Sequence, residues 1–177
     1  KARGTVADLR MWGDRTGTSV YAYELETAGE RPITSTRIRA ALAEGRVRDA
    51  TDLLGRRWAL EGVVAHGRGE GEGFGIRTAN LVVPEQLCAV ADGVYAAYAL
   101  VDGACYKAAV NVGIPMTFEG RARSNVEAHL LDFEGDLYGK PLALEFVEWL
   151  RPMQRFGSDE ELVATITGNI DWVRQNL

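Results

Sequence analysis

Six short apolar segments, separated by turn-forming residues, constrain the fold of this chain more than any other feature of its sequence. They span residues 60–66, 79–83, 93–101, 106–112, 125–131 and 142–150, and are rich in β-branched, aromatic and small apolar side chains. Asp102-Gly103 and Glu134-Gly135-Asp136 are typical turn signals. Because no long helical pattern lies between the segments, the sequence predicts a mainly β domain, an antiparallel barrel or sandwich.

Helices are predicted before the β region. The hydroxyls of Thr34-Ser35-Thr36 can cap an apolar helical run that ends at Gly45. Residues 47–54 form a second short helix, which Gly55 closes. The stretch before them, residues 1–31, is polar and is interpreted as a piece of another structure.

A closing helix is predicted at the other end of the chain. Ser158 followed by Glu161 is a capping-box pattern. Apolar residues then recur every three or four positions and form one face of a helix; they are Leu162, Ile166, Ile170, Val173 and Leu177. We expect this helix to pack on the barrel.

Composition excludes several classes of protein. Hydrophobic residues make up 46% of the 177, enough for a core, and the formal charge of -5 argues against a nucleic-acid partner. No apolar run approaches the roughly 20 residues that span a bilayer, and we expect no signal peptide. Cys88 and Cys105 are isolated, which favours reduced thiols and a cytoplasmic location. Because the chain begins with Lys1, we expect a processed, cloned or partial product.

A glycine-rich stretch is the first candidate binding element. Gly67, Gly69, Gly71, Gly73 and Gly75 occupy alternate positions. Such a backbone can turn tightly and bring its N–H groups close to a phosphate. The stretch matches neither a Walker A motif nor a dinucleotide-binding motif, and on its own it is more typical of a surface hairpin.

Two polar residues follow this stretch. Thr78 and Asn80 are two positions apart, so in an extended chain their side chains point to the same side. Both offer oxygen atoms of the kind that Mg²⁺ accepts beside phosphate. The alternative is that they are ordinary polar residues at the start of a strand.

Several blocks in one order resemble the riboflavin kinase module of bacterial bifunctional FAD synthetases. The glycine stretch with Thr78-Ala79-Asn80-Leu81 resembles that family's phosphate-and-magnesium element, G-R-x-x-G-F-P-T-A-N. Four further blocks agree with family motifs in order and spacing. Asn111-Val112-Gly113 together with Thr117-Phe118 resembles N-x-G-x-x-P-T-F, and Val126–Phe133 resembles E-V-H-L-L-D-F. Gly135–Gly139 matches G-D-L-Y-G, and Leu150-Arg151 together with Phe156 resembles the family's L-R…F stretch. The resemblance implies a six-stranded antiparallel Greek-key β-barrel over residues 55–177, closed by a C-terminal helix.

The resemblance also implies an activity, the transfer of the ATP γ-phosphate to the 5′-hydroxyl of riboflavin, which yields FMN and ADP. It assigns the ATP phosphates to the Gly67–Gly75 backbone, and Mg²⁺ to Thr78 and Asn80. Glu127 would accept the hydroxyl proton. The residues expected at the flavin are Asn111, Arg151 and Phe156.

His129 is less determined. Period-two alternation places it on the same strand face as Glu127. It could orient Glu127 or cap the barrel interior.

Residues 33–39 resemble the I-S-S-T-x-I-R motif near the end of the adenylyltransferase domain in the same family. Residues 1–54 are therefore expected to be the tail of that domain with a helical linker. The family's H-x-G-H nucleotide motif does not occur, since the histidines are His66 and His129. We expect no FMN adenylylation by this chain alone, and an adenylyltransferase domain as a missing partner.

Three departures from the family pattern fall at the expected site. Glu72 stands where the family has arginine, Arg77 replaces proline, and Pro115-Met116 replaces an Arg-Pro type of pair. Like charges about 4 Å apart cost about 4 kcal/mol near a protein surface, so Glu72 would repel an ATP phosphate that it faced. One hypothesis is that the two charges have been exchanged, so that Arg77 contacts the phosphate and Glu72 points to solvent. The alternatives are a degraded flavin- or nucleotide-binding protein with a regulatory role, or a scaffold for the missing domain. The surviving metal-binding pair and base favour the enzyme.

Overall fold

The computed structural model describes residues 4–67, 75–84, 87, 90–113 and 125–177, which form two compact units. The first unit, Lys1–Ile33, contains helix α1 (Val6–Thr16) and two paired two-residue strands, β1 (Thr27–Ala28) and β2 (Arg31–Pro32). Thr5 begins α1 with a reciprocal capping box, because its Oγ1 accepts from the Asp8 N–H and its own N–H donates to the Asp8 carboxylate.

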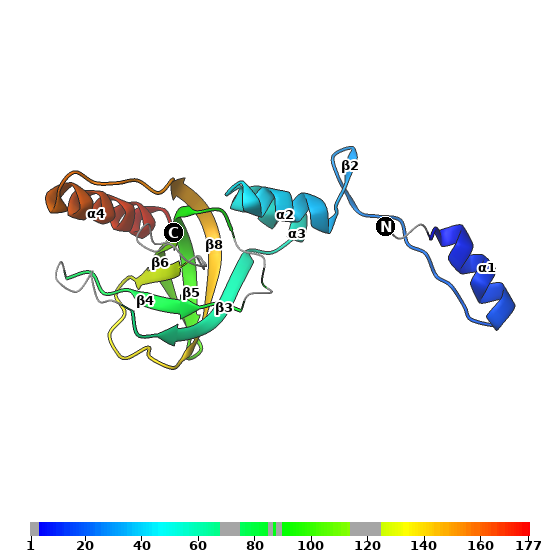
Figure 1. The fold of residues 1–177 in the computed structure, drawn as a ribbon, viewed down its shortest axis with the longest axis horizontal. Helices are drawn as coiled ribbons and strands as arrows, with labels where there is room; N and C mark the ends of the chain where they lie inside the picture. Colours follow the sequence, from blue (N-terminus) through cyan, green and yellow to red (C-terminus); the bar gives the residue numbers. More distant parts are fainter. Residues whose placement is uncertain (1–3, 68–74, 85–86, 88–89, 114–124) are drawn as a thin grey trace, which may run out of the picture. The chain divides into compact units, whose positions relative to one another are not determined.

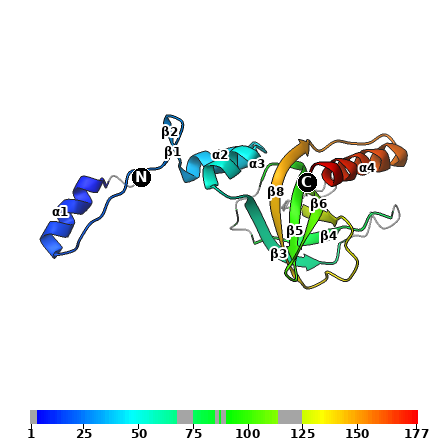
Figure 2. The same cartoon turned by 180° about the vertical axis from the view of Figure 1, so that it is seen from behind.

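The second unit, Thr34–Leu177, begins with two short helices. In α2 (Ser35–Ala43) the Oγ1 of the N-cap Thr34 accepts from the Arg37 N–H at 3.2 Å, as expected from the sequence. Helix α3 (Val47–Leu54) ends at Gly55 in a left-handed conformation, φ 69°, and packs against β3 and β8 (Figure 2). Both helices thus belong to the same compact unit as the barrel. The assignment of residues 1–54 to an adenylyltransferase-like tail stays a prediction.

Six antiparallel strands follow and close into a barrel in the order β3-β4-β7-β6-β5-β8 (Figure 1). Strands β5, β6 and β7 are consecutive neighbours, and β8 returns to pair with β5, which is a Greek key. The predicted six-stranded Greek-key barrel is therefore confirmed. The strands are β3 (Trp58–Ala65), β4 (Ala79–Val82), β5 (Gly93–Val101), β6 (Ala104–Gly113), β7 (Asn125–Leu130) and β8 (Pro141–Arg151).

Side chains fill the inside of the barrel. Tyr95 and Phe146 are fully buried and meet edge to face, with ring centroids 5.1 Å apart. The Tyr95 hydroxyl donates to the Ala91 carbonyl at 2.6 Å, so its polar end is satisfied. Buried alanines such as Ala97 and Ala108 fit around these two large rings. The interior is therefore a packed core.

Helix α4 (Asp159–Asn176) covers part of the outer face of the barrel, beside β6 (Figure 1). Its Val173 is buried in a second apolar cluster with Ala96 and Leu131. The predicted N-cap is present, because Ser158 Oγ accepts from the Glu161 N–H at 3.3 Å. The box is not reciprocal: the Glu161 carboxylate accepts from the Gly157 N–H instead.

In the part of the chain that the structure describes, no helix combines the length and apolarity needed to cross a membrane. Cys105 is exposed and forms no disulfide, and Cys88 lies outside the described residues.

Candidate active site

A row of residues crosses the outer face of the barrel from strand to strand. Asn80 pairs with Glu127 across β4 and β7, and Glu127 pairs with Asn111 across β7 and β6. Asn111 pairs with Val94 on β5, which pairs with Arg151 on β8. The two neighbours of Glu127 in β7 are buried, so the row faces outwards by period-two alternation. Strand register thus brings together four residues that the sequence predicted at the site.

The first cavity, here called the helix cavity, lies between this outer face and α4. Its volume is ≈ 460 Å³.

 The barrel contributes Asn111, Glu127 and Arg151 to the helix cavity, and the segment before α4 contributes Phe156. Helix α4 supplies the opposite wall through Leu162, Ile166 and Asn169. A largely apolar cavity with a few polar groups is typical of a site for a flat ring system.

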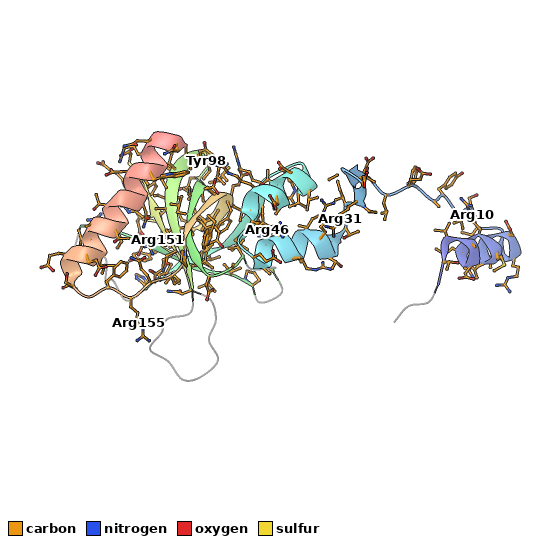
Figure 3. The ribbon with its side chains drawn as sticks, turned by 90° about the horizontal axis from the view of Figure 1, so that it is seen from above. Arg10, Arg31, Arg46, Tyr98, Arg151 and Arg155 are labelled. Carbon is orange, nitrogen blue, oxygen red and sulfur yellow. The ribbon has the colours of Figure 1, made fainter. Side chains whose placement is uncertain are left out.

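Arg151 is held at one end of the helix cavity, beside α4 (Figure 3). Its Nε donates to Asn169 Oδ1 at 3.4 Å and its Nη1 donates to the Pro152 carbonyl at 3.1 Å. Its guanidinium carbon lies 5.7 Å from the centre of the Phe156 ring. Burial lowers the pKa of the Arg151 guanidinium, which nevertheless stays charged near neutral pH. Arg151 and Phe156, both predicted at a flavin, thus line one cavity together.

The second cavity, here called the mouth cavity, has a volume of ≈ 580 Å³ and opens at one end of the barrel. Inward-facing residues such as Ala79 and Ala128 form its floor. Its rim contains the described residues that the sequence predicted at a nucleotide: Gly67, Gly75, Arg77, Thr78 and Asn80. Gly69, Gly71 and Gly73 lie outside the described residues, as do Glu72 and Pro115-Met116.

Gly67 and Asn80 approach each other closely in the mouth cavity. A Cβ atom added to Gly67 would overlap the side-chain amide of Asn80, with Oδ1 only 2.8 Å away. Only glycine leaves the Asn80 side chain its place at this position. The first glycine of the stretch is therefore required by the side chain that it faces.

The two cavities meet at Thr78 and His129, which line both. His129 Nδ1 forms a hydrogen bond of 2.8 Å with the Arg77 carbonyl, directly before Thr78. Ala128 and Leu130 point inwards and His129 faces out, so the His129 side chain is not part of the packed core. On the same face, Asn125 Nδ2 donates to Glu127 Oε1 at 2.6 Å and orients that carboxylate.

Thr78 and Asn80 offer neutral oxygens side by side on one wall of the mouth cavity. Such donors suit a hard cation that is also bound by phosphate oxygens, so these residues fit Mg²⁺. Among the described residues, no cluster of three or more His, Cys, Asp or Glu side chains could hold a metal ion.

Two site residues were missed by sequence reasoning. Asn125 lies two positions before Glu127, so strand alternation could have placed it on the same face. Asn169 lies three residues after Ile166, which makes it a polar residue on the apolar face of α4. Both signals are weak, because polar residues at such positions are common without any functional role.

Comparisons with known proteins indicate the family of this chain. The family model for flavokinase, described as riboflavin kinase, matches residues 54–177. The bifunctional riboflavin kinase/FMN adenylyltransferase of Listeria monocytogenes is 31% identical over 166 residues, which cover 94% of this chain and 52% of the relative. Its namesake from Pseudomonas fluorescens is 36% identical over 162 residues, 92% of this chain and 52% of the relative.

A crystal structure of a Streptococcus pneumoniae protein, described as a macrolide-efflux protein, is similar over 99% of this chain and 56% of its own, with a TM-score of 0.86 and 31% identity. The chain spans about half the length of the curated relatives that it matches. The family model covers well over half of the chain, including both cavities of the site. The chain belongs to the riboflavin kinase family.

Proposed function

We propose that this chain transfers the γ-phosphate of ATP to the 5′-hydroxyl of riboflavin and releases FMN and ADP. The observation that carries the proposal is the cross-strand pairing of Asn80 with Glu127. Asn80 belongs to the mouth cavity and Glu127 to the helix cavity. ATP in the mouth cavity and the 5′-hydroxyl of riboflavin in the helix cavity would therefore face each other across one strand pair.

ATP occupies the mouth cavity in this proposal. The Arg77 side chain supplies a cation there, in the position where the family pattern has proline. Thr78 and Asn80 hold Mg²⁺, which supplies positive charge against the phosphate oxygens. Phosphoryl transfer depends mainly on positioning and on neutralising the charge of the transferred group. The rim of the mouth cavity provides groups suited to both.

Riboflavin occupies the helix cavity. The apolar face of α4, with Leu162 and Ile166, suits the flavin ring, and Phe156 offers it an aromatic face. Asn111 and Arg151 supply hydrogen-bond donors for its polar atoms.

Glu127 accepts the proton of the attacking hydroxyl. Its carboxylate is held by Asn125, and its strand places it between Asn80 and Asn111. General base catalysis by a positioned carboxylate contributes about 10²- to 10⁴-fold to a rate. Glu127 lines the helix cavity, and strand register places it next to Asn80, which lines the mouth cavity.

We propose further that residues 1–54 are the tail of an adenylyltransferase-like domain within a longer, cytoplasmic protein. The relatives named above carry both activities in their names and are about twice as long as the matched part. The first unit, Lys1–Ile33, lies before the part that the family model matches.

The test is FMN formation by the purified chain with riboflavin, ATP and Mg²⁺, followed by chromatography. Glu127→Gln is expected to lower kcat by about 10²- to 10⁴-fold while riboflavin still binds, because the amide cannot accept the proton. Glu61→Gln is the matched control, since Glu61 is exposed on β3 and lines neither cavity. Riboflavin or ADP binding without any FMN would refute the kinase and leave the non-catalytic binding protein. Full activity of Glu127→Gln would exclude Glu127 as the base.

A further inference from the structure

We infer that His129 is a positioning residue, which fixes Thr78 at the junction of the two cavities. The inference rests on the proposed function, because it concerns the geometry that phosphate transfer requires. Among the residues that the structure describes, Thr78 and His129 line both cavities. The placement of Thr78 therefore decides how the two ligands would face each other.

The strand pairing of β4 and β7 stops beside these residues. Ala79 pairs with Ala128, and β4 begins at Ala79, so Thr78 is the first residue beyond the ladder. A residue outside the ladder lacks the backbone hydrogen bonds that fix its neighbours. The antiparallel register places His129 opposite Thr78 at this point.

The His129 side chain holds the backbone where the ladder has ended. Its Nδ1 lies 2.8 Å from the Arg77 carbonyl oxygen, the acceptor of the peptide group that leads into Thr78. Because a carbonyl only accepts, Nδ1 must carry the proton in this bond. Thr78 is thus fixed from both sides, by the Ala79 pair in β4 and by this bond. The bond thus joins β7, which carries Glu127, to the segment that carries the Thr78 hydroxyl.

The expected effect is larger on catalysis than on stability. One neutral hydrogen bond contributes only modestly to the stability of a fold. A displacement of about 1 Å in a reacting group can cost about 10²-fold in rate. Loss of the bond should therefore lower kcat by roughly 10- to 100-fold and weaken Mg·ADP binding, with riboflavin affinity little changed.

Two amide variants separate this role from its rivals. In His129→Asn, the amide nitrogen takes the place of Nδ1 and can still donate to the Arg77 carbonyl. In His129→Gln, the amide instead reaches the place of Nε2, so the bond to the carbonyl is lost. If His129 acted as an acid or base through Nε2, both amides would fail alike, since neither titrates near neutral pH.

The experiment measures kcat and KM for FMN formation, together with Mg·ADP and riboflavin affinities by calorimetry, for the wild type, His129→Asn, His129→Gln and His129→Ala. We expect the asparagine variant to recover most of the kcat and of the Mg·ADP affinity that the other two lose. Equal losses in all three variants, or no loss in His129→Ala, would overturn the positioning role. If the wild type forms no FMN, the proposed function fails. The ranking of Mg·ADP affinities then still decides whether His129 positions Thr78.

Discussion

Gly67→Ala offers the sharpest test of the mouth cavity, because its effect must pass through one neighbouring side chain. The new Cβ would overlap the Asn80 amide, whose Oδ1 would be 2.8 Å away. Asn80 must then turn away from its present place. Overpacking of this kind costs about 1–3 kcal/mol of stability. A hydrogen bond or ligand contact to a charged group is worth about 1.5–3 kcal/mol, so Mg·ADP binding should weaken by about 10- to 150-fold.

Calorimetric titration with Mg·ADP measures this loss, and the double variant with Asn80→Ala shows its route. Once the Asn80 amide is removed, the alanine at position 67 has much less to displace. The two single losses should therefore not add. Gly168→Ala is the control: a Cβ there meets nothing within 4 Å, in an exposed part of α4. Alanine in a helix is about 1 kcal/mol more favourable than glycine, so this variant should be more stable with unchanged affinity.

Two results would refute the reasoning. Unchanged Mg·ADP affinity in Gly67→Ala would mean that the Asn80 side chain has no part in nucleotide binding. An equal loss with and without the Asn80 amide would mean that Gly67 meets the ligand directly through its backbone. In that case the close approach between the two residues would be a matter of packing alone.

Asp132→Asn should remove the two-fold hydrogen bond to Arg174, at 2.8 and 3.0 Å, and loosen α4 from the barrel. That bond lowers the pKa of Asp132. Its contribution to the free energy of unfolding is therefore present above the carboxyl pKa of the unfolded chain and is lost as pH falls through the pKa of the folded protein. Melting curves of the wild type and the variant should differ at neutral pH and converge in acid. Phe146→Ala should cost about 3–5 kcal/mol in urea unfolding, as expected for a buried ring. Phe156→Ala should cost less stability but weaken riboflavin binding, measured by fluorescence quenching; the reverse order would contradict the assignment of these two rings.

Much of the barrel could be predicted from the sequence, because its strands alternate and end at turn residues. The strand predicted at residues 125–131 is observed as Asn125–Leu130, and the predicted 93–101 as Gly93–Val101. Helix α1 could not be recognised in this way. Its Leu9 and Trp12 are about half exposed, so its pattern has no apolar face that meets a core. The available signal was the Thr5 capping box, which uses Asp8 instead of glutamate.

The site was only half predictable for a different reason. Motif resemblance could identify Asn80, Glu127 and Arg151, which lie far apart in the sequence. Nothing local determines that β4 pairs with β7, or that β8 returns beside β5. These pairings place the residues in one row, and they follow from closing the whole barrel. The division into two cavities that share Thr78 and His129 is therefore a property of the fold and could not be derived from the motifs.

The size of the barrel explains why its site lies outside it. Six strands enclose a space that side chains fill, here with Tyr95 and Phe146, so no ligand of flavin size fits within. A ligand must bind at the mouth or on the outer face. Strands β5 and β6 leave room for a ligand on the outer face, because the outward side chains that line the helix cavity there, Val94 and Ala109, are small. A bulky residue at position 109 should therefore fill the helix cavity and exclude riboflavin, while leaving the inward core and the mouth cavity unchanged.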